Sequence, residues 1–70
     1  MYERSLSCDG HTRRFQISPR GASGWEVREE QDSHLVRTRV YDDWHRVERA
    51  RTHFQAEVTT LEQAGWVESN

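Results

Sequence analysis

The chain contains 70 residues, of which 33% are hydrophobic and 31% are charged, and its formal net charge is −2 at pH 7. A chain of this length forms one domain at most, with a core so small that comparable domains often depend on disulfides, a metal or oligomerisation. One cysteine excludes an intrachain disulfide, and the sequence holds no paired zinc ligands, no hydrophobic signal segment and no apolar run near the ~20 residues of a membrane span.

We therefore expect a single domain over residues 1–70, without a cofactor, a metal or a membrane partner, in the cytoplasm. It forms either a tight monomer or, as we favour, a homodimer. All ten basic residues are arginine, which the codon usage of a GC-rich genome explains, so we expect a small bacterial protein. Because the net charge is close to neutral, any case for an anionic partner depends on how the arginines are distributed.

The N-terminal part of the chain predicts a β-hairpin. Residues 2–8 alternate weakly between apolar and polar positions, and residues 11–17 form the returning strand. Asp9 and Gly10 between them suit a two-residue type I′ turn, in which both residues need positive φ. A disordered N-terminus is the alternative to the first strand.

A second hairpin follows a loop. Residues 18–24 contain a proline and two glycines, which is typical of a loop. Residues 25–30 alternate as a half-buried strand, and residues 34–41 form the clearest strand, rich in β-branched residues. In that last strand we predict that Val36, Thr38 and Val40 face the core.

The last third of the chain predicts one amphipathic helix over residues 43–64. Apolar residues recur at steps of three, four and seven, which places them on one helical face. Asp42 or Asp43 can serve as the N-cap. Gly65 suits the left-handed position after the helix, which would bring Leu61 and Trp66 together in a Schellman cap. The apolar stripe consists of Trp44, Val47, Phe54, Val58 and Leu61.

These elements predict an α+β fold, a four-stranded antiparallel meander followed by one long helix packed on one sheet face. The expected core consists of Phe15, Ile17, Trp25, Val27, Val36 and Val40 against the helix stripe. The other sheet face is left bare.

Arg51 interrupts the apolar stripe of the helix. In one interpretation its stem packs on the protein while its guanidinium reaches solvent or a carboxylate. In the other, Arg51 and the nearby edge of Trp44 lie at an interface with a second subunit, or Arg51 reaches an anion.

The bare sheet face is where we expect a function. It is predicted to carry Arg14, Arg28, Arg37 and Arg39 with Tyr41, interrupted by a few glutamates. Three interpretations remain open. The face is a solvated surface with cross-strand ion pairs, or it pairs with another copy or a partner protein, or it binds single-stranded nucleic acid through arginine–phosphate contacts and aromatic stacking.

The order of elements resembles the small ββββα folds of the PUR, PC4 and whirly groups. Residues 14–17, 24–27 and 34–37 would correspond to strands of a PUR repeat, and Ala64-Gly65 to the end of its helix. The resemblance covers most of the chain and is architectural, without a diagnostic motif. It implies subunits or repeats that pair into dimers and bind single-stranded nucleic acid on their sheets.

We predict that the protein is not an enzyme. Cys8 and His11 face each other across the predicted turn, but a lone cysteine is more often incidental than activated. Asp42 and Asp43 are explained by helix capping without a metal. The sequence therefore predicts a small, non-enzymatic binding protein that contacts single-stranded nucleic acid, with a protein-interaction or regulatory module as the alternative.

Overall fold

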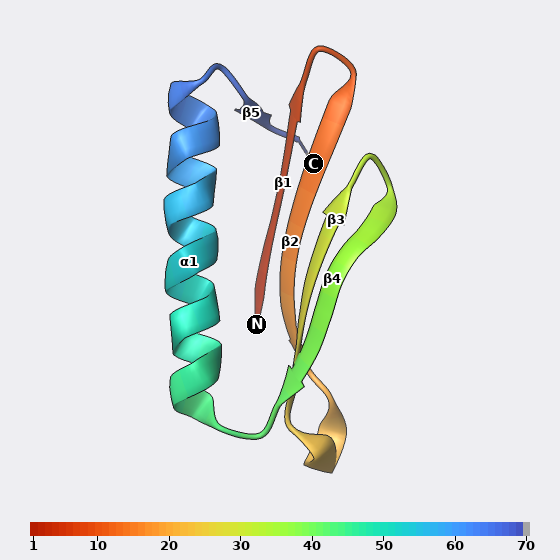
Figure 1. Cartoon of the computed structure of the whole chain (residues 1–70), viewed down its shortest axis with the longest axis vertical. Coiled ribbons are helices and arrows are strands. Elements are labelled where there is room, and N and C mark those ends of the chain that lie inside the picture. Colours follow the sequence, from red (N-terminus) through yellow and green to blue (C-terminus); the bar gives the residue numbers. More distant parts are fainter. Residues whose placement is uncertain (70) are drawn as a thin grey trace.

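The computed structural model describes residues 1–69, with the backbone alone for Ser23, and consists of one antiparallel sheet with a long helix on one face (Figure 1). The α+β architecture predicted from the sequence is confirmed, and every predicted boundary lies within two residues of the observed one. The elements are β1 (Tyr2–Cys8), β2 (His11–Pro19), a short 3-10 helix (Gly21–Ser23), β3 (Trp25–Gln31), β4 (His34–Tyr41), α1 (Trp44–Gln63) and β5 (Val67–Glu68).

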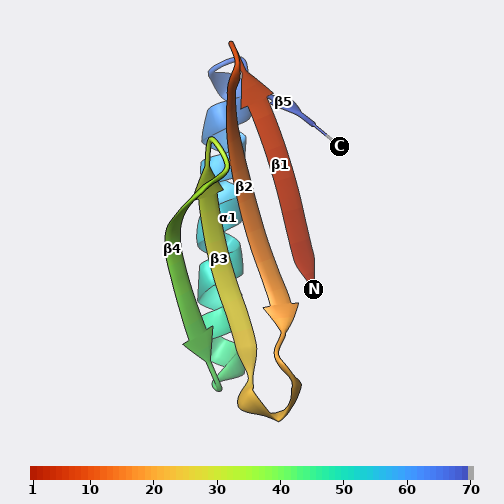
Figure 2. The same ribbon diagram turned by 90° about the vertical axis from the view of Figure 1, so that its right-hand side faces the viewer.

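The strands lie in the order β4-β3-β2-β1-β5, so that the first four form a simple meander (Figure 2). The turn between β1 and β2 has φ values of 52° at Asp9 and 81° at Gly10, which confirms the predicted turn with two left-handed residues. The turn between β3 and β4 repeats this geometry without glycine, at Asp32 and Ser33, with φ values of 52° and 67°. Each hairpin is therefore fixed by its own tight turn.

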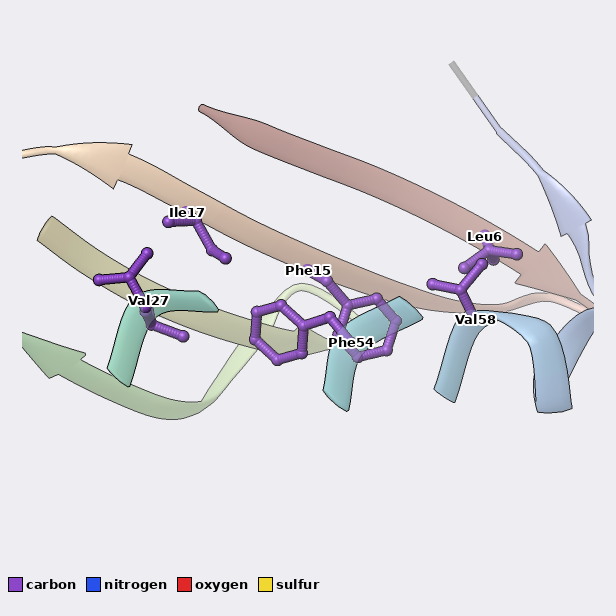
Figure 3. Close-up of a cluster of buried hydrophobic side chains, with 7 residues drawn as sticks. Leu6, Phe15, Ile17, Val27, Phe54 and Val58 are labelled. Carbon is purple, nitrogen blue, oxygen red and sulfur yellow. The ribbon is translucent and has the colours of Figure 1, made fainter. Parts of the chain in front are cut away.

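The core lies between α1 and the middle of the sheet (Figure 3). Phe15 of β2 is fully buried, and its ring centroid lies 5.0 Å from that of Phe54 of α1. The buried hydrophobic residues are Leu6, Phe15, Ile17 and Val27 from the sheet and Val47, Phe54 and Val58 from the helix.

Both ends of α1 are capped by the residues that the sequence singled out. Asp43 is the N-cap, and its side chain accepts a hydrogen bond of 2.9 Å from the backbone N–H of His45. At the other end, the N–H of Trp66 donates to the carbonyl of Leu61, and the N–H of Gly65, with φ of 102°, donates to Glu62. This is the Schellman pattern, so the predicted end of the helix is confirmed.

β5 is a two-residue strand that the sequence did not predict. It pairs antiparallel with β1 and places Glu68 opposite Leu6. Arg4 of β1 donates to both carboxylate oxygens of Glu68, from Nε at 2.9 Å to each, and this bond lowers the pKa of Glu68. The segment after the helix thus covers part of the outer edge of β1, while β4 remains a free edge.

β4 turns the opposite set of side chains toward the helix from the set that we predicted. Arg39 is paired with Val27 of β3, and directly paired residues share a face of the sheet. Since Val27 is buried under α1, the side chains of Arg37, Arg39 and Tyr41 lie on the helix side. The prediction that Val36, Thr38 and Val40 face the core is therefore wrong.

The exposed fractions of the β4 valines agree with this correction. Val36 is 52% exposed and Val40 is 48% exposed, so neither belongs to the core. A shift in register between Glu29 and Glu30 marks a β-bulge, in which Val36 is the additional residue of β4.

The width of the helix explains why β4 contributes nothing to the core. Four strands spaced ~4.8 Å apart span about 14 Å between the outermost axes, whereas a helix with its side chains is about 10–12 Å across. One helix therefore covers β1 to β3, from which all buried sheet residues come, and leaves the helix side of β4 partly open.

Candidate anion-binding cleft

The space between β4 and α1 is a cleft of about 640 Å³. β4 forms one wall and the first three turns of α1 form the other, while β3 forms the floor. The lining residues are Val27, Glu29, Arg37, Arg39, Tyr41, Arg46, Arg49, Ala50, His53 and Phe54. Four of these ten are arginines, in a chain whose net charge is negative.

Half of the ten arginines are bound to carboxylates elsewhere on the molecule. On the outer face of the sheet, Arg14 is paired with Glu3, and Arg28 with Glu30 at 2.8 Å. Arg20 is paired with Glu26 at 3.3 Å. The remaining two paired arginines are Arg4, with Glu62 and Glu68, and Arg13, with Glu29 and Glu57.

Four of the five arginines without an ion pair among residues 1–69 line the cleft. These are Arg37 and Arg39 on β4 and Arg46 and Arg49 on α1. Within the same described part of the chain, Arg51 is the fifth without a carboxylate, and its guanidinium carbon lies 5.9 Å from the centroid of the Tyr2 ring. Because the other arginines are paired with carboxylates, most of the unpaired positive charge lies in the cleft between β4 and α1.

Glu29 is the one carboxylate that lines the cleft, and it is held by an arginine outside the lining. In the sheet, Glu29 is paired with Arg37 of β4. The carboxylate of Glu29, however, accepts a hydrogen bond of 3.0 Å from Nη2 of Arg13. The same Nη2 donates to Glu57 of α1 at 2.9 Å. Arg13 therefore joins β2, β3 and α1, and Glu29 is paired with Arg13 and not with Arg37 in the described part of the chain.

We expect the Arg13→Met variant to be less stable than the wild type by about 2–3 kcal/mol, because two carboxylates lose a charged hydrogen bond. The side chain of Glu29 is 13% exposed, so water compensates it poorly. Urea unfolding followed by circular dichroism measures the difference. Adding Glu29→Gln to this variant should recover part of the loss, and a variant within 0.5 kcal/mol of wild type would show that the network is not stabilising.

Three aromatic side chains lie near the start of the helix, and one of them, Tyr41, lines the cleft. Tyr41 is paired with Trp25 in the sheet. The Trp25 ring centroid lies 4.9 Å from that of Trp44 on the first turn of α1. Neither tryptophan lines the cleft, so of these three rings Tyr41 is the one that adjoins the arginines.

The structure divides the predicted binding residues between two faces. Arg37, Arg39 and Tyr41 lie in the cleft, whereas Arg14 and Arg28 lie on the outer face in ion pairs. The prediction that the four arginines share one bare face is therefore wrong, because the parity assigned to β4 was wrong. The predicted binding roles of these residues remain predictions.

The two predicted interface residues, Trp44 and Arg51, are both exposed. Trp44 packs against Trp25, and Arg51 lies over Tyr2 in a cation–π contact. The interface role predicted for these two residues remains a prediction.

The sequence interpretation missed the helix wall of the cleft, which consists of Arg46, Arg49 and His53. A signal was present, because residues spaced by three and seven lie along one side of a helix, next to the apolar stripe. Nε2 of His53 also lies 3.5 Å from Oε1 of Glu57, four residues further along the helix.

The surroundings of Cys8 disfavour the thiolate form of its side chain. Cys8 is paired with His11 across the hairpin, but the imidazole Nδ1 lies 3.2 Å from Asp32. Partial burial and the neighbouring Asp9 carboxylate raise the pKa of the Cys8 thiol, whereas a nucleophilic cysteine needs a lowered one. Within the described residues there is no cluster of three or more histidine, cysteine or acidic side chains that could hold a metal ion.

No family model, no curated protein and no solved structure matches the chain. No helix within residues 1–69 is long and apolar enough to cross a membrane.

Proposed function

We propose that the protein is a small, non-enzymatic binding protein that holds single-stranded nucleic acid in the cleft between β4 and α1. The observation that carries the proposal is the gathering of Arg37, Arg39, Arg46 and Arg49 in one cleft, without a carboxylate partner in the described part of the chain. Guanidinium groups bind phosphate oxygens in a planar, two-bond geometry.

The arrangement of the charges favours a linear polyanion over a single phosphate. Arg37 and Arg39 are two residues apart on β4, a spacing of about 6.8 Å along the strand. Arg46 and Arg49 are three residues apart on α1, a rise of about 4.5 Å. Two facing rows of cations thus follow the length of the cleft, as a phosphodiester backbone requires.

The aromatic end of the cleft favours a single strand over a duplex. Base stacking on an aromatic ring contributes about 1–3 kcal/mol per base and needs a base whose flat face is accessible. Tyr41, which is partly exposed, offers such a surface beside the arginines. In a duplex the base faces are covered by their neighbours, so this ring would contribute little.

We expect a fluorescent single-stranded oligonucleotide to bind with a slope of log affinity against log salt of about −2.8, that is, 0.7 for each of four phosphate contacts. Raising the salt from 50 to 200 mM should then weaken binding by about 50-fold. Fluorescence anisotropy measures both quantities. A hairpin duplex of the same length and charge is the control, and it should bind more weakly at each salt concentration. Absence of any binding at tens of micromolar protein in low salt would refute the proposal.

The proposal includes a homodimer acting in the cytoplasm. Its support is the small core, with seven buried hydrophobic residues in the described part of the chain. Trp44 and Arg51 are seven residues apart, so they lie on one side of α1 and offer a contact surface away from β4. Light scattering on the binding samples reports the mass, and a concentration-independent monomer would remove the homodimer from the proposal.

A further inference from the structure

β4 is a free edge of the sheet (Figure 2). It has β3 as its one neighbour in the strand order, and residues 34–40 are all exposed. In a strand with one neighbour, every second residue directs its N–H and C=O groups away from the sheet. β4 therefore presents a row of backbone donors and acceptors that another extended segment can bond.

The two faces of β4 have different chemistry, which restricts what can be added beside it. On the helix side, Arg37 and Arg39 line the cleft without ion pairs among residues 1–69. On the outer side, the part of β4 that follows the bulge carries Thr38 and Val40, which are both exposed, Val40 at 48%. Side chains of an added strand lie beside those of β4 on the same face. The complementary segment has acidic residues facing the cleft and apolar residues facing outward, in alternation.

We propose that β4 accepts an extended acidic segment of a partner protein as an additional strand. Backbone hydrogen bonds to the free edge would supply affinity, and the alternation of side chains would supply specificity, as in other cases of strand addition. The acidic side chains would lie against Arg37 and Arg39, within reach of Arg46 and Arg49 across the cleft. The β-bulge at Val36 limits the pairing to the part of β4 that follows it.

A second copy of this chain fits the edge less well. If two copies paired antiparallel about Thr38, each arginine at positions 37 and 39 would lie beside an arginine of the other copy. Like charges directly opposite each other in a sheet are destabilising. The charge of the edge therefore selects an acidic segment over self-association.

Strand addition would regulate the cleft, since the acidic segment and a nucleic acid would compete for the same arginines. This competition rests on the proposed function, whereas the addition of the strand does not. A partner that carries such a segment would release the nucleic acid without any change in the fold.

The test uses the full chain and a seven-residue peptide of alternating glutamate and valine with blocked ends. One control peptide has the same composition with the glutamates contiguous, which places acids on both faces of a strand. A second control has the alternating sequence with an N-methyl group on every amide, so that neither edge of the peptide can donate backbone hydrogen bonds. Hydrogen exchange measured by NMR reports the backbone of β4, and displacement of a labelled oligonucleotide reports competition.

We expect the alternating peptide to slow exchange at alternate amides of β4 by about tenfold or more, and neither control to do so. Equal protection by the contiguous or the N-methylated peptide would show that charge alone acts and would overturn the proposal. Protection of the outward-facing amides of β4 without peptide, at protein concentrations where the mass is doubled, would identify a second copy as the occupant of this edge and would also overturn it. If the oligonucleotide does not bind but the peptide still protects β4, the proposed function fails and strand addition stands.

Discussion

The Arg46→Gln/Arg49→Gln double variant is expected to bind a single-stranded oligonucleotide about 10- to 100-fold more weakly than the wild type at 50 mM salt. Its salt slope should fall to about −1.4, because two of four phosphate contacts are removed. The fold should be retained. Arg46 is in the first turn of α1, where a positive charge is unfavourable beside the positive end of the helix dipole, so its removal does not destabilise the helix. Anisotropy titrations at several salt concentrations measure both effects.

The Arg14→Gln/Arg28→Gln variant is the matched control, with the same change in composition and net charge. These arginines lie on the outer face in ion pairs with Glu3 and Glu30, so their loss should change the affinity by less than about threefold. The comparison separates a site in the cleft from a general effect of charge. Equal losses in the two variants would contradict a cleft site and would favour binding spread over both faces.

The Phe15→Ala variant is expected to lose about 3–5 kcal/mol of stability, the cost of deleting a buried ring and leaving a cavity. Phe15 is fully buried at the centre of the core, where its ring meets that of Phe54. At roughly 0.05–0.15 kcal/mol per residue, a 70-residue domain has a total stability of about 3.5–10.5 kcal/mol, so this loss removes about a third of it or more. The variant should therefore unfold at a much lower urea concentration than the wild type, as judged by near-ultraviolet circular dichroism.

Val40→Ala is the contrasting substitution, because the sequence pattern placed Val40 in the core and the structure exposes 48% of it. Its expected effect is within about 0.5 kcal/mol, as for other surface positions. A loss of 2 kcal/mol or more at Val40, or a small loss at Phe15, would contradict the assignment of faces on which the cleft depends.

The elements that the sequence specifies through local chemistry were predicted correctly. Asp43 caps α1 because its carboxylate reaches a free backbone amide two residues on, and Gly65 ends the helix because it adopts a left-handed conformation. The Asp9-Gly10 turn follows from the same preference for positive φ. Each of these depends on residues a few positions apart, so no knowledge of the tertiary structure was needed.

The face of β4 could not be read from its own residues. Val36, Thr38 and Val40 look like an inward set because β-branched residues usually face a core. The pairing of Arg39 with Val27 reverses that assignment, and the bulge at Val36 breaks the alternation. The pairing and the bulge are both properties of the contact between β3 and β4. The inner face of β4 becomes a wall of the cleft because the single helix is too narrow to cover it.

The sequence predicted the β4 residues of the candidate site but not its helix residues, because the latter depend on contacts between elements. Arg37, Arg39 and Tyr41 were predicted to bind together, and the cleft contains all three. Which arginines remain available depends on the carboxylates that each one meets in space, such as Glu29 with Arg13. The spacing of Arg46, Arg49 and His53 places them on one side of α1, but it is the packing of α1 against β4 that makes this side a wall of the cleft.

The pairing of β5 with β1 has a consequence for the order of folding. Of the five strands described, β1 is synthesised first, yet its outer edge gains a neighbour only when Val67 and Glu68 have been synthesised. The meander can form from contacts between successive strands, but the contact that joins residues 4 and 68 spans almost the whole chain, and contacts of such sequence separation slow folding. Closure of this edge should therefore be the last step of folding and should take place after translation of the helix.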